Sequence, residues 1–383
     1  MARFDAVVVG AGPAGSTAAR ELAASGARVL VLDKSTFPRY KACGGGIPLR
    51  TERLLPFPID VVVEDSVNLL EVSLRGRSGF VRDSGSPFAR MVMRDRFDDL
   101  LLEWACAAGA QFRPLSTVRV VDSDSDELTV RCDDSFEAQA RFLVCADGAH
   151  SPTGKMTGLG EGIAECAAWE VEFEGSATNR ARWSGRAFVD VGYSPWGYGW
   201  LFPKEKHLSV GMVLPGDNAR ELKGRVAALA ERIGVATEPT AISRGHKIRF
   251  RRENEPIAGA RALLAGDAAG LADEFTEEGI VYALQSGRLA ARNLLRALDC
   301  GPGLASYQED VNSEIMPELK AARYMAGLFY AGLRRGGRGW FTAARLMPGL
   351  WSAFFAVQRG ESSYAREVTR FWFVRLARRL QSS

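Results

Sequence analysis

A glycine-rich loop lies near the start of the chain, between a short apolar run and an alanine-rich stretch. Residues 5–9 predict a buried β-strand, Gly-Ala-Gly-Pro-Ala-Gly follows at 10–15, and residues 13–25 have the composition of a helix. Gly10 permits a tight turn, Gly12 lets a ligand approach the backbone, and Gly15 lets the helix pack closely on the strand. The unpaired N–H groups at the helix start favour a phosphate. This order predicts a Rossmann-type α/β fold with a dinucleotide site.

An acidic residue follows the next predicted strand. Residues 28–32 are mostly apolar and lead into Asp33, whose carboxylate suits the ribose hydroxyls of an adenosine. A fortuitous glycine-rich turn is the alternative, but strand, loop, helix and acid all stand in the expected order. The loop does not distinguish FAD from NAD.

Two later segments make that distinction. Ala-Asp-Gly at 146–148 follows a predicted strand at 140–145, and Gly-Asp-Ala-Ala-Gly at 266–270 follows a predicted strand at 262–265. A carboxylate at such a strand end can accept hydrogen bonds from a ribityl chain, and the helix expected from Gly279 can face the edge of a flavin ring. Each acidic pair alone is typical of a plain turn. Together with the glycine loop they predict FAD, bound along its whole length.

The three motifs resemble those of the glutathione-reductase-fold flavoproteins related to p-hydroxybenzoate hydroxylase. A narrower resemblance, to the geranylgeranyl reductase family of FAD-dependent oxidoreductases, rests on two runs. The first is Arg-Tyr-Lys-Ala-Cys-Gly-Gly-Gly-Ile-Pro at 39–48, and the second is Tyr-Gly-Trp-Leu-Phe-Pro-Lys at 198–204, which matches that family's Tyr-x-Trp-x-Phe-Pro-Lys signature. A third run, Arg-x-x-Phe-Asp-x-x-Leu at 94–101, is shared more broadly, and its arginine typically contacts the flavin.

The resemblance implies an enzyme that saturates C=C bonds in a geranylgeranyl-type isoprenoid chain. Reduced FAD would supply hydride from N5 and an acid would protonate the other carbon, while the protein supplies placement and excludes water. The implied catalytic residues are Cys43, Tyr198, Trp200 and Phe202. The implied cofactor-binding residues are Gly10, Gly12, Ala14, Gly15, Asp33, Lys34, Cys43, Gly44, Gly46, Arg94, Val118, Asp147, Gly266, Asp267, Gly279 and Ile280.

Each of these assignments has a plainer alternative. At strand spacing the three aromatic residues project to one face and line one wall, but an ordinary aromatic core strand has the same pattern. Cys43 is the candidate proton donor or a flavin neighbour, and the alternative is a small buried residue beside a glycine run. Arg39 and Lys41 are candidates for holding a phosphate or a lipid head group, unless they are solvated.

The order of these features predicts a discontinuous architecture. Residues 1–159 and 251–300 form a Rossmann-type FAD-binding domain, and 160–250 form an inserted mixed β-sheet domain for the substrate. Residues 301–383 form a C-terminal helical segment that is basic and aromatic.

The end of that segment is strongly basic. The chain has a net charge of +3, yet residues 320–383 contain twelve Lys or Arg and only two Asp or Glu. Aromatic residues and arginines are interleaved there, namely Trp340, Trp351, Phe354, Phe355, Phe371, Trp372 and Phe373 with Arg334, Arg335, Arg338, Arg345, Arg375, Arg378 and Arg379. An amphipathic helix of this composition predicts peripheral contact with an anionic membrane, and a helical cap on the core is the alternative. Nucleic-acid binding is not expected, because no nucleic-acid motif accompanies the arginines.

Composition also limits the other function classes. Six scattered cysteines without a Cys-x-x-Cys pair favour a reducing, cytoplasmic setting. Three isolated histidines make a metal site unexpected. The longest late uncharged stretch, residues 346–357, is shorter than the ~20 residues that a membrane span needs. No second Gly-x-Gly-x-x-Gly follows a strand, so electrons are expected from NAD(P)H or a ferredoxin-like donor that docks transiently.

One segment departs from the family pattern. Relatives usually have a proline and a small glycine-rich stretch there, but this chain has four carboxylates between Gly270 and Gly279. They would lower the flavin potential if they faced the ring, and they are solvated loop residues otherwise.

Two other functions stay open. One is a flavin-dependent monooxygenase or halogenase on the same scaffold, although halogenases carry Trp-x-Trp-x-Ile-Pro where this chain has Tyr-Gly-Trp-Leu-Phe-Pro. The other is a non-catalytic, flavin-containing membrane scaffold.

Overall fold

The computed structural model describes residues 2–123, 127–193, 196–215, 219–301 and 303–370. The chain forms two compact units, each made of three separate stretches. The first unit consists of Met1–Lys41, Asp95–Ala164 and Ile248–Leu319, and the second of Ala42–Arg94, Glu165–Lys247 and Lys320–Ser383. These units divide the chain differently from the predicted domains. Residues 42–94 belong with the predicted substrate sheet, and 301–319 belong with the glycine loop.

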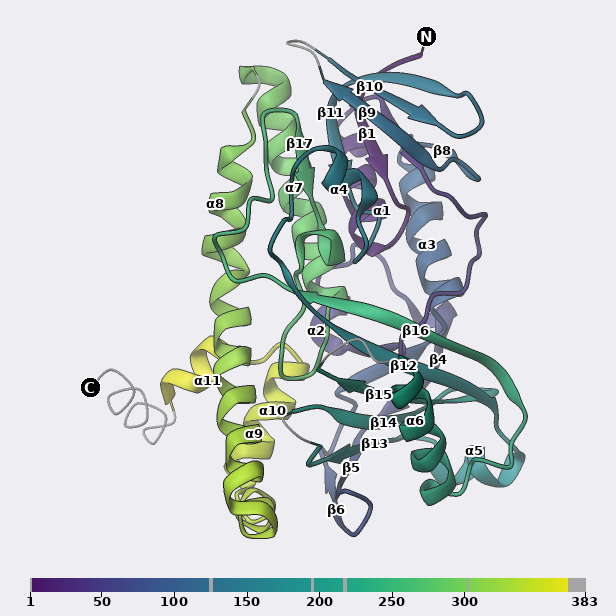
Figure 1. Cartoon of the computed structure of the whole chain (residues 1–383), viewed down its shortest axis with the longest axis vertical. Coiled ribbons are helices and arrows are strands. Elements are labelled where there is room, and N and C mark those ends of the chain that lie inside the picture. The colour runs from purple at the N-terminus through teal and green to yellow at the C-terminus, as the bar shows by residue number, and fades with distance from the viewer. Residues whose placement is uncertain (1, 124–126, 194–195, 216–218, 302, 371–383) are drawn as a thin grey trace. The chain divides into compact units, whose positions relative to one another are not determined.

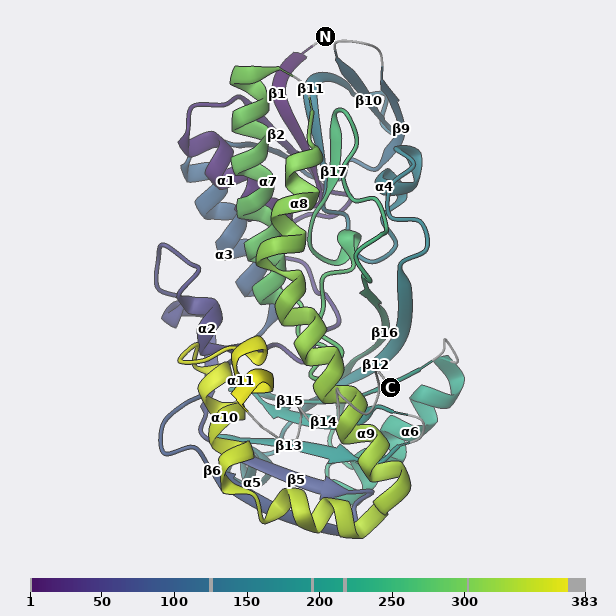
Figure 2. The same ribbon diagram turned by 90° about the vertical axis from the view of Figure 1, so that its left-hand side faces the viewer.

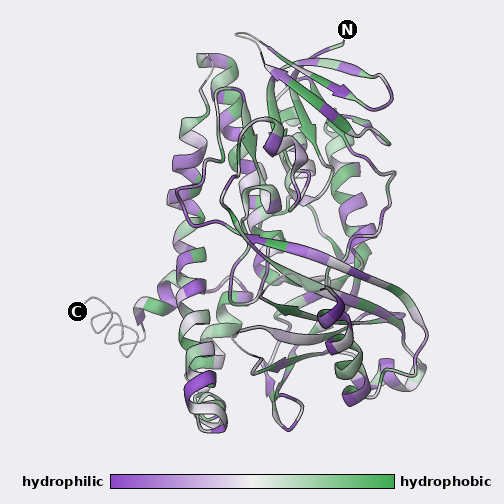
Figure 3. Ribbon diagram, in the orientation of Figure 1, coloured by the Kyte–Doolittle hydropathy of each residue, from purple (hydrophilic) through white to green (hydrophobic). Residues whose placement is uncertain are grey.

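The first unit is built on a seven-stranded sheet with the order β8–β2–β1–β11–β10–β9, in which β17 also pairs with β11 (Figure 1). Its strands are β1 (Ala2–Val9), β2 (Val29–Leu32), β8 (Gln111–Arg113), β9 (Val118–Ser123), β10 (Leu128–Cys132), β11 (Glu137–Cys145) and β17 (Ala262–Leu264). All strands but β10 run in the same direction, and the central strands are hydrophobic (Figure 3). Because parallel strands end at the same edge, the segments after β1, β11 and β17 meet there.

Helices of the first unit hold the loops at that edge. They are α1 (Pro13–Ala24), α3 (Arg94–Ala107), α4 (Pro152–Met156), the 3-10 helix η2 (Gly266–Ala269), α7 (Ile280–Cys300) and α8 (Ala305–Glu314). α1 lies beside α7 (Figure 2), where a Cβ on Gly287 would stand 2.5 Å from the carbonyl oxygen of Ala14. Glycine permits that close approach, so α7 packs directly on the helix that follows the glycine loop.

The second unit contains a seven-stranded mixed sheet with the order β16–β12–β15–β14–β13–β5–β6 and a three-stranded sheet with the order β3–β7–β4. The larger sheet consists of β5 (Leu69–Leu74), β6 (Ser78–Asp83), β12 (Ala164–Glu174), β13 (Arg186–Val191), β14 (Tyr198–Pro203), β15 (His207–Leu214) and β16 (Thr240–Phe250). The smaller sheet consists of β3 (Gly46–Pro48), β4 (Val63–Val67) and β7 (Ala89–Val92). β5 pairs in parallel with β13, and this pairing brings residues 42–94 into the second unit.

A hydrophobic core lies on one face of the larger sheet. Leu201 and Met212 on this face belong to the same buried cluster as Leu229 of α6 (Ala219–Ile233) and Trp183 of α5 (Ala177–Trp183). Side chains alternate along a strand, so the residues of β14 between these core positions point to the opposite face. The sequence signature of β14 therefore divides between a core face and a second face.

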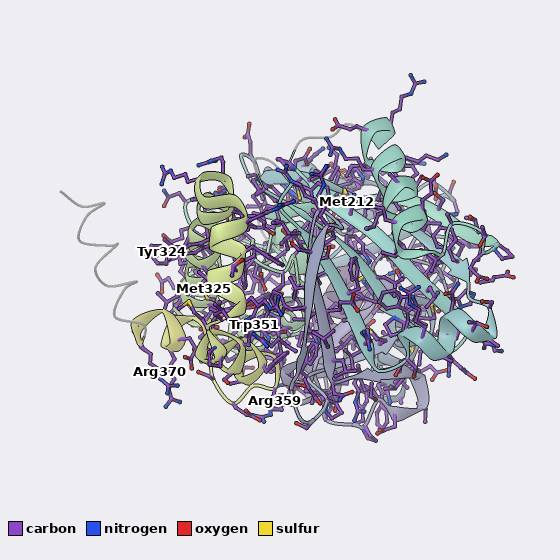
Figure 4. All side chains as sticks on the ribbon, turned by 90° about the horizontal axis from the view of Figure 1, so that it is seen from below. Met212, Tyr324, Met325, Trp351, Arg359 and Arg370 are labelled. Carbon is purple, nitrogen blue, oxygen red and sulfur yellow. The ribbon has the colours of Figure 1, made fainter. Side chains whose placement is uncertain are left out.

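The C-terminal segment is helical as far as residue 370, as predicted, in α9 (Met316–Arg345), α10 (Pro348–Gln358) and α11 (Tyr364–Arg370). Ring contacts join Phe341 and Trp351 to Phe80 of β6, and Phe354 and Phe355 to Phe88. Trp351 is labelled among the C-terminal helices in Figure 4. Much of the predicted aromatic stripe thus packs inside the second unit. The predicted residues Phe371, Trp372, Phe373, Arg375, Arg378 and Arg379 lie outside the described residues.

Two short helices, α2 (Leu49–Glu52) and the 3-10 helix η1 (Asp60–Val62), complete the second unit. Across the described ranges, no helix is both long and apolar enough to span a bilayer. In the same residues, no group of His, Cys, Asp and Glu is arranged to hold a metal ion.

Candidate functional site

The glycine loop is in direct contact with the segment that follows β11. Gly10 has a φ of +100°, and a Cβ there would stand 2.3 Å from the carbonyl oxygen of Ala146. A Cβ on Gly15 would lie 1.8 Å from the carbonyl oxygen of Gly10. Neither Gly10 nor Gly15 has room for a side chain. The turn at residues 10–15 therefore packs closely against the start of α1. The motif predicts that the backbone of this loop binds a phosphate, and this contact stays a prediction.

The segment after β17 reaches the same place. A Cβ on Gly266 would stand 2.9 Å from the Cβ of Ala14, and one on Gly279 would stand 3.4 Å from Oδ1 of Asp267. Three motifs that are more than a hundred residues apart in the chain therefore surround the N-terminus of α1. The sheet edge makes this possible, because each motif follows a parallel strand.

Two of the predicted cofactor carboxylates also stabilise the loops. Asp33 is buried and accepts hydrogen bonds from the backbone N–H groups of Ala11 and Ser35, each at 2.9 Å. Asp147 accepts bonds from the Ser151 hydroxyl at 2.7 Å and from both the N–H and the hydroxyl of Thr153 at 2.9 and 2.7 Å. These bonds fix the turns that surround the glycine loop, and the cofactor contacts of both residues stay predictions.

Arg39 supplies a positive charge beside the glycine loop. Its Nη2 lies 3.1 Å from Oδ2 of the fully buried Asp98 and 3.5 Å from where a Cβ of Gly12 would be. Its Nη1 is buried without a hydrogen-bond partner among the described residues. Buried donors are normally satisfied, so this nitrogen suits a phosphate oxygen of the cofactor. Lys41, whose Nζ lies 2.9 Å from Oδ2 of Asp267, brings a second cation to the same loops.

The acidic segment has local structural roles. Asp273 is fully buried and accepts bonds from the N–H groups of Phe275 and Thr276, at 2.9 and 2.6 Å. Glu278 accepts a bond from the N–H of Val281 at 2.8 Å in the first turn of α7. Glu274 forms an ion pair with Arg252 at 2.5 Å. These carboxylates hold the loop before α7, but the expectation that they are solvated is wrong for Asp273, which is buried, and Glu274 and Glu278 are half-buried.

The predicted aromatic wall lies on one face of the second unit's larger sheet. Trp200 is buried, whereas Tyr198 and Phe202 are half-buried. The Trp200 ring lies 6.0 Å from the ring of Tyr198 and 6.3 Å from that of Phe202, between centroids. A Cβ on Gly211 of the neighbouring strand would stand 2.1 Å from the Trp200 indole, so glycine there leaves room for the ring. The three aromatic residues thus form a continuous surface opposite the hydrophobic core.

The loop that carries Cys43 lies against this wall. A Cβ on Gly44 would stand 2.8 Å from Cδ2 of Phe202 and 3.0 Å from Nε1 of Trp200. Gly45 has a φ of +71°, and a Cβ there would be 2.1 Å from the carbonyl oxygen of Val92. The run of glycines is therefore a packing requirement, and it holds the half-buried Cys43 next to the aromatic surface.

A buried ion pair lies beside the wall, and sequence reasoning did not predict it. Nζ of Lys204 is 2.5 Å from Oε1 of Glu172, and both side chains are 1% exposed. Burial alone would lower the pKa of Lys204, but the charges of Glu172 and Glu170 and the hydrogen bond to Glu172 outweigh burial and raise it. The ammonium group therefore stays charged. Lys204 is the last residue of the family signature and could have been noticed in the sequence. Glu170 and Glu172 could not have been predicted to be buried, because alternating charges on a strand usually face solvent.

Polar atoms without partners surround the same wall. Oε2 of Glu172, Oγ of Ser209 and Nε1 of Trp200 are buried with no hydrogen-bond partner among the described residues. Strand register aligns Ser209 with both Glu172 and Phe202. A face that combines aromatic rings with unsatisfied polar atoms is unusual for a purely structural sheet, and it suits a ligand or ordered water.

The other predicted site residues occupy separate places. Lys34 is exposed just after β2, and Val118 is buried at the start of β9. Arg94 is buried at the start of α3, and Ile280 is buried at the start of α7. Gly46 begins β3, where a Cβ would be 3.4 Å from Phe202. Their contacts with a cofactor stay predictions.

Comparisons with known proteins agree with this geometry. A family model described as FAD binding domain matches residues 3–302. Geranylgeranyl diphosphate reductase of Rhodobacter capsulatus is 32% identical over 307 residues, which are 78% of this chain and 77% of the relative. Menaquinone reductase of Mycobacterium tuberculosis is 31% identical over 367 residues, covering 85% of this chain and 82% of the relative.

Solved structures share the fold. A geranylgeranyl bacteriochlorophyll reductase-like protein from Thermoplasma acidophilum, 24% identical, superposes with a TM-score of 0.75 over 85% of this chain and 88% of its own. A flavin-dependent brominase, 20% identical, superposes with a TM-score of 0.76 over 98% of this chain and 100% of its own. The fold alone does not separate the two activities. The chain belongs to the geranylgeranyl reductase family, and it is an FAD-dependent oxidoreductase.

Proposed function

We propose that this oxidoreductase saturates C=C bonds in a geranylgeranyl-type isoprenoid chain. The observation that carries the proposal is the aromatic face of β14, which lies against the loop of Cys43. Further support comes from the names of the two relatives, a geranylgeranyl diphosphate reductase and a menaquinone reductase. An isolated alkene has no carbonyl through which a protein could polarise it. This reaction therefore depends more on positioning the substrate and excluding water from the site than on acid activation.

The first unit would hold the cofactor. The backbone at Gly12, the orphaned Nη1 of Arg39 and the ammonium group of Lys41 would bind the pyrophosphate, and Asp33 would bind the adenosine ribose. Asp267 would accept hydrogen bonds from the ribityl chain. Bound FAD, once reduced, supplies hydride from N5.

The second unit would hold the isoprenoid and the proton. Tyr198, Trp200 and Phe202 would place the apolar chain and exclude water from it. Cys43 would hold a proton on Sγ and deliver it to the alkene carbon that does not receive hydride. One hydride and one proton together add two hydrogens to the double bond, and the thiolate left behind regains its proton from solvent.

The electrons and the substrate both come from outside the protein. We expect NAD(P)H or a ferredoxin-like donor to reduce the flavin by transient docking. An isoprenoid tail partitions into lipid, so the proposal includes a cytoplasmic protein that contacts a membrane peripherally.

Anaerobic turnover tests this function. Dithionite-reduced holoprotein is incubated with geranylgeranyl diphosphate or with menaquinone, and the products are weighed by mass spectrometry. Mass gains in steps of two hydrogens are expected with at least one substrate. Cys43→Ser should lose most of the product while retaining FAD, whereas Cys300→Ser, at an exposed cysteine, should behave like the wild type.

The same assay in air tests the alternative. The structural likeness to a brominase favours oxygen chemistry as the second candidate function. A monooxygenase or halogenase would form oxygenated or halogenated product only in air, and would leave the isoprenoid unsaturated without oxygen. That pair of results would replace the proposed function.

A further inference from the structure

The end of α9 and the turn that follows it expose large apolar side chains. Trp340, Leu346 and Met347 are 39%, 71% and 39% exposed. They are three of the nine large hydrophobic residues that the described chain leaves exposed, and they lie within eight residues of one another. Single exposed hydrophobic residues are ordinary, but a cluster marks an interaction surface.

This turn is anchored by other residues. Phe341 is buried with its ring centroid 5.4 Å from that of Phe80, and Nε1 of Trp351 donates a hydrogen bond of 2.9 Å to the carbonyl oxygen of Ala344. A kink at Gly337, with a φ of 51°, redirects the last turns of α9 before this point. The inward residues supply much of the packing, and Leu346, which is 71% exposed, contributes little to it. The Trp340 indole also packs on its own helix, where a Cβ on Gly332 would stand 2.2 Å from it.

Positive charge surrounds the exposed apolar residues. Arg334, Arg335, Arg338 and Arg345 are all exposed, and residues 334–349 contain no Asp or Glu. Within the described part of the chain, no carboxylate pairs with the first three of these arginines. Exposed arginines without paired carboxylates therefore surround exposed apolar side chains. A partner for this surface has to be both anionic and hydrophobic.

We propose that residues 334–347 form a docking surface for an anionic lipid bilayer. The arginines would contact lipid phosphates, while Trp340, Leu346 and Met347 would enter the interfacial layer. An acidic protein would satisfy the arginines without requiring an apolar tip, and a second copy of this chain would bring like charges together. The inference locates the peripheral membrane contact that the proposed function includes, but its observations do not depend on the proposed reduction.

Vesicle co-sedimentation of the holoprotein tests this surface. Binding to vesicles that contain phosphatidylglycerol is expected, with weaker binding at high salt and to vesicles of phosphatidylcholine alone. Arg335→Ala/Arg338→Ala should weaken binding about 30-fold, from about fivefold for each lost cation. Leu346→Ser and Trp340→Ser should each weaken it as well.

Matched variants away from the turn serve as controls. Arg220→Ala/Lys223→Ala removes two exposed cations from α6, and Trp104→Ser removes a tryptophan that is 43% exposed on α3. Both should bind vesicles like the wild type, and circular dichroism checks that every variant is folded. Absence of binding to anionic vesicles, or equal losses in the control variants, would overturn the proposal. So would a dimer in light scattering that Leu346→Ser converts to a monomer, because the occupant would then be a second copy.

Discussion

The ammonium group of Lys204 lies 2.5 Å from a carboxylate oxygen of Glu172, and each side chain is 1% exposed. Burying two charges is costly, and their attraction offsets this cost only while both are present. The pair lies beside the aromatic wall, where Cε of Lys204 is 3.3 Å from the position of a Cβ on Gly45. We interpret it as the support that holds the Cys43 loop against β14.

Replacing one member of this ion pair should lower the free energy of unfolding more than replacing both members. Lys204→Met leaves Glu172 buried and unpaired, and should lower the free energy of unfolding by about 3–5 kcal/mol. Lys204→Met/Glu172→Leu should recover part of that loss, because the unpaired Glu172 carboxylate is gone and only Glu170 remains as a buried charge there. Urea denaturation measures both, and a double variant as unstable as the single one would contradict the explanation.

The contribution of the Lys204–Glu172 pair to the free energy of unfolding should not change with pH near neutrality. The pKa of Lys204 is raised in the folded protein, since the charges of the two glutamates outweigh burial. A group with a raised folded pKa stabilises fully below its unfolded pKa, about 10.4 for lysine, and loses that stabilisation as pH rises through the folded value. The difference in unfolding free energy between wild type and Lys204→Met/Glu172→Leu should therefore be constant from about pH 6 to about pH 9. A decline within that range would show that the ammonium group is not held charged.

Arg39→Lys should weaken FAD binding about 10- to 100-fold, from the loss of one charge-assisted hydrogen bond. A lysine keeps the charge opposite Asp98 but lacks the second donor that Nη1 provides. Fluorescence titration of the apoprotein with FAD measures the affinity. Arg292→Lys is the matched control and should bind FAD normally, because this partly exposed arginine of α7 pairs with Asp310 and Glu314 of α8.

Gly44→Ala should lower isoprenoid turnover about 10- to 100-fold with FAD still bound. The new methyl group would stand 2.8 Å from Phe202 and 3.0 Å from Nε1 of Trp200, so the wall or the loop has to shift. Gly224→Ala is the control, because nothing lies within 4 Å of that position on α6. Its turnover should be unchanged and its stability equal or up to about 1 kcal/mol higher. Equal turnover of the two variants would show that the wall does not hold the substrate.

Cys145 should resist alkylation in the native protein. It lies at the end of β11, and burial, with a smaller effect of Asp147, raises its pKa to about 12. Below that pH it is a thiol, and only thiolates react quickly. Iodoacetamide at about pH 8 should label the exposed Cys106 and Cys300 first, and Cys145 only after unfolding in urea. Peptide mass spectrometry identifies each labelled cysteine. Early labelling of Cys145 would contradict this prediction and show that the end of β11 becomes accessible to solvent in the native protein.

Much of the cofactor unit follows from local sequence. The glycine loop, Asp33 and the strands before Asp147 and Asp267 are patterns of adjacent residues, and a parallel sheet brings such strand ends together. The aromatic wall was also predictable, because a spacing of two along a strand places side chains on one face. Helix α3 also follows from local sequence, since its apolar residues recur at helical spacing.

The remaining features depend on strand order and register. Residues 42–94 join the second unit because β5 pairs with β13, more than a hundred positions further along the chain, and because the Cys43 loop packs on β14. Glu172 meets Lys204 because β12, β15 and β14 are neighbours in register, and Phe341 and Trp351 turn inward because Phe80 of β6 lies beneath them. Thus the sequence by itself determined the nucleotide loop, the flavin motifs and the signature strand, because backbone conformation and side-chain periodicity are local properties. Only the tertiary structure decided which charges are buried together and which aromatic residues stay exposed, because those depend on contacts between distant segments.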